Sequence, residues 1–91
     1  MPFVYILKCG DGSFYAGAAK DLARRLEQHR AGQASRYTRS HAPVRLAWSR
    51  RVRTWRGALQ EERRIKSLTR AQKQALVRSA PRPLARATRP L

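Results

Sequence analysis

Carboxylates are scarce in this chain, and one of them stands where a carboxylate is costly. Of the five acidic residues, Asp11 suits a Gly-rich turn and Asp21 suits a helix cap. Glu27 can pair with neighbouring arginines, and Glu61 can be solvated. Glu62 lies on the apolar stripe of a predicted helix, where an unpaired carboxylate costs free energy. Glu62 therefore needs a cation, either an arginine in a structural ion pair or a metal ion.

Two tyrosines, an arginine and a histidine are the other side chains that could do chemistry. Tyr5 and Tyr15 lie in two predicted strands, whereas Arg25 and His29 lie one turn apart on a predicted helix. Phenol and imidazole groups can transfer protons, and a guanidinium can hold a phosphate. Each residue also has a structural interpretation, because strand tyrosines pack, arginines form ion pairs and helix-end histidines are often solvated.

A predicted β-hairpin at the start of the chain positions the two tyrosines. Phe3–Leu7 and Ser13–Gly17 are apolar and aromatic runs that flank the Gly-rich break Gly10–Gly12. Side chains alternate faces along a strand, so a loop with an odd number of residues places Tyr5 and Tyr15 on the same side of the sheet.

The arginine and the histidine belong to a helix that is predicted from Asp21 to Gly32. An aspartate at the start and a glycine at the end are typical helix boundaries. Leu22 and Leu26 are four residues apart and form its apolar side, and Arg25 and His29 lie beside them.

A loop and a third strand are predicted next. Residues 33–43 are polar and basic and require neither helix nor strand, which suits a loop near bound phosphate. Val44–Val52 alternates as a strand does, with Val44, Leu46 and Trp48 expected on one face.

Two helices are predicted to follow. The helix that carries Glu62 starts at Thr54 and continues through Leu68. Trp48 and Trp55 both lie in apolar stripes, so we expect them in the core rather than as platforms for base stacking. Thr69 is the expected cap of a last helix that runs through Val77 and that Pro81 closes.

The length of the chain allows one domain, which we place at residues 1–80. Residues 81–91 contain three prolines and three arginines with little to bury, and this composition predicts a disordered basic tail.

The charge of the chain favours a polyanionic partner. Lys and Arg number 21 against 5 acids, which gives a net charge of +16 and a pI near 11.9. Nucleic acid is the first expectation, and a membrane surface is a weaker alternative. Cys9 is the only cysteine, so neither an intramolecular disulfide nor a Cys-based metal cluster is expected. No apolar run approaches the ~20 residues that span a bilayer, and we expect a cytoplasmic protein.

Taken in order along the chain, these residues form a recognisable set. Residues 1–80 resemble the GIY-YIG nuclease superfamily. The resemblance rests on Val4-Tyr5-Ile6, Tyr15-Ala16-Gly17, Arg25 and His29 on one helix, and Glu62 on a later helix. Val4 stands where the first motif has its glycine, and Ala16 stands where the second has isoleucine. The nearest resemblance is to the small stand-alone, single-domain bacterial members, through Arg36–His41, Pro43–Leu46 and Ile65–Arg70.

The resemblance implies a fold and a chemistry. The fold is α/β (α+β), a small three-stranded antiparallel sheet flanked by helices in the order β-β-α-β-α-α. The chemistry is hydrolysis of DNA phosphodiester bonds with one Mg²⁺ or Mn²⁺ ion. The residues that it assigns are Tyr5, Tyr15, Arg25 and His29 for catalysis and Glu62 for the metal. The candidates for nucleic-acid binding are Arg24, Arg36, Tyr37, Arg39 and Lys66.

The implied roles follow from the chemistry of each group. Glu62 binds the ion through oxygen. Tyr5 takes a proton from the attacking water, which needs nearby positive charge from Arg25 or a relay through Tyr15, because a phenol has a pKa of ~10. Arg25 also holds the phosphate. His29 orients one of the tyrosines or gives a proton to the leaving group.

Three functions remain open at this stage. The first is an endonuclease of DNA repair or DNA processing, as a monomer or weak homodimer, with DNA as its partner and neither a membrane nor a small-molecule cofactor. The alternative is a non-catalytic nucleic-acid-binding module on a GIY-YIG fold. A basic structural protein of ribosomal type is the third, although it gives no reason for the ordered set.

Overall fold

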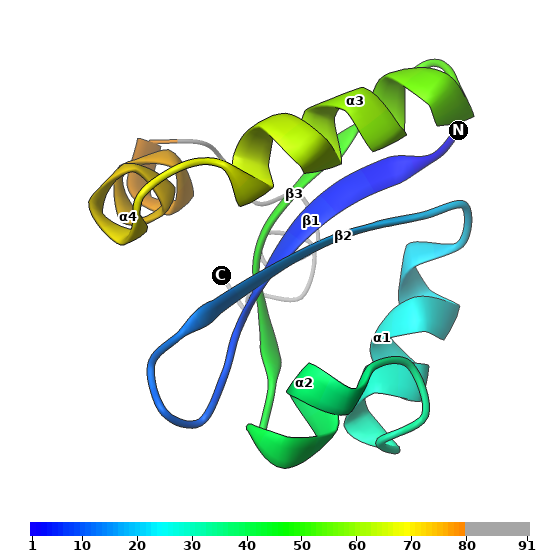
Figure 1. Ribbon diagram of the computed structural model, residues 1–91. Helices are drawn as coiled ribbons and strands as arrows, with labels where there is room; N and C mark the ends of the chain where they lie inside the picture. Colours follow the sequence, from blue (N-terminus) through cyan, green and yellow to red (C-terminus); the bar gives the residue numbers. More distant parts are fainter. Residues whose placement is uncertain (80–91) are drawn as a thin grey trace, which may run out of the picture.

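A computed structural model describes residues 1–79 (Figure 1). The predicted tail at 81–91 and the predicted end of the last helix at Pro81 lie outside the described residues. A three-stranded sheet runs through the middle, with helices on both faces. This is the expected α+β architecture, and the predicted fold class is confirmed.

The N-terminal hairpin consists of β1 (Phe3–Lys8) and β2 (Phe14–Ala19). Gly12 has a φ of 86° in the connecting turn, a value that favours glycine. In the antiparallel register Tyr5 pairs with Gly17 and Leu7 pairs with Tyr15, so the two tyrosines share one face as predicted.

The third strand, β3 (Arg45–Arg51), pairs antiparallel with the other side of β1, which gives the strand order β2-β1-β3. The register between β1 and β3 shifts by one residue after Ile6. Ile6 is opposite Trp48, whereas the next residue, Leu7, is opposite Leu46. This bulge reverses the alternation of side chains. Trp48 therefore packs on the opposite face from Val44 and Leu46, and the prediction that all three share a face is wrong.

The two faces of the sheet have separate hydrophobic cores. Helix α1 (Leu22–Arg30) covers the tyrosine face, where Leu22 and Leu26 pack with Tyr5 and Leu7. The side chain of Asp21 accepts a hydrogen bond from the backbone N–H of Arg24, which confirms the predicted cap. The opposite face is covered by the last two helices, and its buried cluster is Val4, Ile6, Ala16, Trp48 and Ile65.

A short helix occupies the segment in which neither helix nor strand was expected. Helix α2 (Arg36–Ser40) packs beside α1, and the side chain of Ser35 caps it. Five residues are too few to show a helical period, so the pattern of apolar residues could not predict α2.

The last two helices begin at the predicted positions. Helix α3 (Trp55–Lys66) begins after Thr54, and helix α4 (Arg70–Ser79) begins after Thr69. Thr69 and Gln72 exchange hydrogen bonds between side chain and backbone, a capping box. Trp48 is in the core, as expected, but the expectation for Trp55 is wrong, because its side chain is 37% exposed.

Candidate active site

The centre of the site is a buried contact between β1 and α1. Tyr5 Oη lies 2.8 Å from His29 Nε2 in a hydrogen bond. The two residues are only 1% and 2% exposed. Two of the residues expected to act together are therefore directly joined, and the polar partner of the Tyr5 hydroxyl is His29.

The other nitrogen of the imidazole is held by α2. His29 Nδ1 lies 2.8 Å from Thr38 Oγ1, and the Thr38 hydroxyl also lies 3.3 Å from the backbone oxygen of Ser35. Thr38 is fully buried. Both ring nitrogens of His29 thus have protein partners, which fixes the plane of the ring.

The position of Tyr5 depends on the residue opposite it in β2. A Cβ atom on Gly17 would lie only 2.4 Å from Tyr5 Oη and 2.5 Å from Cζ. The phenol therefore lies directly over the backbone of Gly17, and only glycine leaves room for it. This is the physical reason for glycine at the third position of Tyr15-Ala16-Gly17.

A row of aromatic rings extends from the buried pair toward the β1–β2 turn. The Tyr15 ring makes an edge contact with His29 and stacks on Tyr37, with centroid distances of 5.4 and 5.8 Å. Tyr37 stacks in turn on His41 at 4.1 Å. The Tyr37 hydroxyl donates to Ser13 Oγ at 2.7 Å, which ties α2 to the turn.

Burial controls the electrostatics of the buried pair. It raises the pKa of Tyr5 to about 12, although the nearby Arg25 guanidinium lowers it in part, and Tyr15 and Glu62 raise it. Burial also lowers the pKa of His29, and the positive charge of Arg25 acts in the same direction. Both shifts favour neutral side chains. Arg25 and Glu62 thus have opposite effects on the pKa of the Tyr5 phenol.

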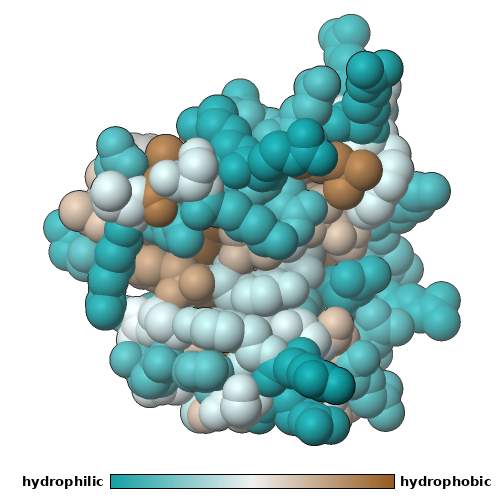
Figure 2. All heavy atoms as spheres, viewed as in Figure 1, coloured by the Kyte–Doolittle hydropathy of each residue, from teal (hydrophilic) through white to brown (hydrophobic). Residues whose placement is uncertain are grey.

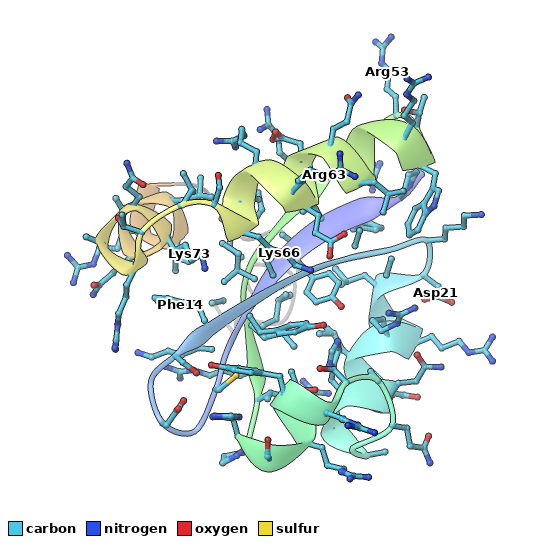
Figure 3. The ribbon with its side chains drawn as sticks, viewed as in Figure 1. Phe14, Asp21, Arg53, Arg63, Lys66 and Lys73 are labelled. Atoms are coloured by element: carbon cyan, nitrogen blue, oxygen red, sulfur yellow. The ribbon has the colours of Figure 1, made fainter. Side chains whose placement is uncertain are left out.

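The cation that compensates Glu62 is Lys66, one turn further along α3. Its Nζ lies 2.9 Å from Glu62 Oε2, and the two side chains are 55% and 20% exposed. Figure 3 shows Lys66 on the side of α3 that is turned toward β2. An ion pair this exposed contributes little to stability. The sequence left the partner open as an arginine or a metal, and in the structure it is a lysine.

The same carboxylate is suited to a divalent ion of the magnesium type. Within residues 1–79, no three His, Cys, Asp or Glu side chains gather closely enough to hold a metal ion by themselves. Mg²⁺ is commonly held by one or two carboxylates together with substrate phosphates and water. A single accessible glutamate fits that coordination, whereas it does not fit a closed, all-protein site.

The adjacent glutamate has a different environment. Glu61 binds Arg64 at 2.8 Å and Arg50 at 3.4 Å, and these cations hold its pKa below the usual range. Glu61 was expected to be solvated, but it is paired with two arginines.

The residues expected to contact nucleic acid lie in three places. Tyr37 belongs to the aromatic row and Lys66 belongs to the Glu62 pair, so both adjoin the tyrosine site. Arg36 and Arg39 line a separate hollow of about 270 Å³ next to Gly32. Arg24 is exposed on α1. In Figure 2 a band of intermediate hydropathy lies between α3 and the α1–α2 side, with hydrophilic side chains above and below it.

Sequence reasoning missed Thr38 and Ser35. Thr38 was quoted only as part of the stretch Arg36–His41, and no role was expected for it. A serine followed by a polar segment is a weak signal for a helix cap, and it could have suggested α2. The contact between Thr38 and His29 spans nine residues and has no local signature.

Comparisons with known proteins identify the family of this chain. Residues 1–75 match the GIY-YIG catalytic domain. UPF0213 proteins of Staphylococcus aureus strains Mu3 and N315 are 45% identical over 76 residues, which are 84% of this chain and 93% of theirs. The solution structure of the UPF0213 protein BH0048 from Bacillus halodurans is similar with a TM-score of 0.60 and 36% identity, over 97% of this chain and 95% of that one.

The described residues contain no helix long and apolar enough to cross a membrane. The match covers both motif tyrosines, Arg25, His29 and Glu62. This chain therefore belongs to the GIY-YIG nuclease family, together with the small single-domain UPF0213 proteins that it resembles.

Proposed function

We propose that this protein is a divalent-metal-dependent DNA endonuclease of DNA repair or DNA processing. The observation that carries the proposal is the buried Tyr5–His29 hydrogen bond beside Arg25 and Glu62, in a chain of the GIY-YIG nuclease family.

The tyrosine and the histidine form the general base. Tyr5 Oη takes a proton from the attacking water while the phenol proton moves to His29 Nε2, 2.8 Å away. Because burial gives Tyr5 a pKa of about 12, a free phenolate is scarce at neutral pH, and the two transfers have to occur together. The oxygen of the water forms a bond to phosphorus, and the bond from phosphorus to the leaving oxygen breaks. The leaving oxygen departs with the electron pair of that bond and takes a proton from solvent water.

The remaining residues hold the substrate. Arg25 binds the scissile phosphate through charge-assisted hydrogen bonds, and Tyr15 keeps the His29 ring in place through its edge contact. Glu62 holds one Mg²⁺ or Mn²⁺ ion, which offsets the negative charge that builds on the phosphate. Arg24, Arg36, Tyr37, Arg39 and Lys66 hold the flanking backbone without reading its sequence.

Nicking of supercoiled plasmid tests the proposal. We expect the native protein to nick DNA at low salt with Mg²⁺ or Mn²⁺ and not with EDTA. Tyr5→Phe should lose about 10²- to 10⁴-fold in rate while it still binds DNA and stays folded by circular dichroism. A native protein that binds DNA and never cuts it would contradict the proposal and favour the binding module.

A further inference from the structure

Thr38 has a hydrogen-bonding environment that determines where the proton of its hydroxyl lies. Its Oγ1 is within reach of two groups, the backbone oxygen of Ser35 at 3.3 Å and His29 Nδ1 at 2.8 Å. The buried Tyr5 hydroxyl needs an acceptor, which is His29 Nε2 at 2.8 Å, so the imidazole proton lies on Nδ1 and the Thr38 hydroxyl donates its own proton to Ser35. Thr38 Oγ1 must then accept a hydrogen bond from His29 Nδ1–H.

This arrangement determines the protonation of the other ring nitrogen. In a neutral imidazole only one nitrogen carries hydrogen. With the proton on Nδ1, His29 Nε2 is a free acceptor and receives the hydrogen bond from the Tyr5 hydroxyl. In the opposite tautomer Nε2–H would point at the phenol oxygen, and His29 could not take up the phenol proton.

We propose that Thr38 is a positioning residue that fixes His29 as its Nδ1–H tautomer, so that Nε2 is available for the proton of Tyr5. The tautomer is a property of the free protein. Its consequence for cleavage rests on the proposed endonuclease function.

The position of Thr38 explains why α2 is part of the site. Ser35 caps α2, and its backbone oxygen is the acceptor for the Thr38 hydroxyl. Because Thr38 and His29 are both buried, water does not replace a missing partner of Nδ1, and the proton on Nδ1 has one place to go.

Nitrogen-15 NMR of the imidazole rings in the free protein measures the tautomer directly. At a pH where His29 is neutral, we expect a protonated Nδ1 and an unprotonated Nε2, and His41→Gln assigns the signals because the chain has two histidines. Finding native His29 as the Nε2–H tautomer would overturn the proposal, whatever any variant does.

A matched pair of substitutions tests the role of the hydroxyl. Thr38→Val keeps the shape and removes the acceptor, so His29 should lose its single Nδ1–H tautomer, and plasmid nicking should slow by about 10- to 100-fold. Thr38→Ser keeps the hydroxyl and should retain both the tautomer and most of the rate.

Equal losses in Thr38→Val and Thr38→Ser would mean that Thr38 acts through packing, which contradicts the proposal. The Nδ1–H tautomer in a native protein that does not cleave DNA would support the assignment of Thr38 and contradict only the endonuclease function.

Discussion

Tyr5 and His29 are ionisable groups that burial keeps neutral. The pKa of the phenol is raised to about 12, and the pKa of the imidazole is lowered. Loss of a proton by Tyr5 alone or gain of one by His29 alone would leave a buried charge, whereas transfer between them keeps the two charges adjacent. The pair is therefore suited to passing a proton between its members.

The lowered pKa of His29 predicts that the protein becomes less stable as the pH falls. As pH falls below about 6.5, the unfolded chain binds a proton at His29 that the folded protein still resists. The free energy of unfolding should therefore decrease between neutral pH and the folded-state pKa, by at most about 1.4 kcal/mol per pH unit. Urea unfolding of the native protein at pH 5 to 7 measures this slope.

Two substitutions separate this effect from other titrations. His29→Gln should remove the slope, whereas His41→Gln should keep it because the buried imidazole is unchanged. An equal slope in both variants would show that His29 does not resist protonation in the folded protein.

Gly17 leaves room for the Tyr5 phenol, which lies against its backbone. Gly17→Ala would place a methyl group 2.4 Å from Tyr5 Oη, so the phenol has to move. We expect a loss of about 1–3 kcal/mol in the free energy of unfolding, and slower nicking because Tyr5 is displaced from His29. Thermal unfolding and plasmid nicking measure the two effects.

Ala18→Gly is the matched control for Gly17→Ala. Its side chain lies on the other face of β2, so it should cost up to about 1 kcal/mol and leave nicking by the folded protein unchanged. Native-like nicking by Gly17→Ala would show that Tyr5 does not need its present position.

For single residues, the sequence predicted the relations that follow from spacing within one hairpin or one helix. It placed both tyrosines on one face, Arg25 and His29 on one helix, and Glu62 on the apolar stripe of a later helix. It gave no sign of Thr38 or of the Lys66 partner. Those contacts depend on the packing of α2 and on which rotamers the long side chains adopt.

Helix caps show the same division at the scale of elements. Asp21 and Thr69 were expected as caps and Thr54 as the start of a helix, and in the structure each of the three side chains caps the helix that follows. Ser35 caps a helix of five residues that has no apolar period of its own. The sequence also did not predict the bulge in β3, because an alternating pattern does not show where the pairing of two strands shifts by one residue.

Two caps can be compared because only one of them supports the site. Ser35→Ala removes the acceptor for the backbone N–H of Tyr37 and Thr38, and Thr69→Ala removes the acceptor for Gln72. Each should lower the free energy of unfolding by about 1 kcal/mol. Only Ser35→Ala should also slow nicking, because α2 holds Thr38 against His29. Equal nicking by the two folded variants would mean that α2 is not needed for catalysis.

For the whole molecule, the net charge of +16 sets the expected mode of DNA binding. Affinity should fall steeply with salt, because each phosphate contact releases counterions. Arg24→Gln should reduce the slope of log K against log[salt] by about 1. Arg53 projects away from the rest of the molecule (Figure 3), and Arg53→Gln is the control that removes the same charge. Equal slopes for the two variants would exclude Arg24 as a phosphate contact.

The two glutamates of α3 provide the most direct test of the central claim, that this site cleaves DNA with a metal held by Glu62. Glu62→Gln and Glu61→Gln each remove one charge at adjacent positions, but only Glu62 faces Tyr5 closely enough to shift its pKa. Nicking of supercoiled plasmid in Mg²⁺, at protein concentrations that give equal DNA binding, should be lost in Glu62→Gln and retained in Glu61→Gln. Equal nicking by both variants would contradict the claim, because the carboxylate of Glu62 would then have no part in the reaction.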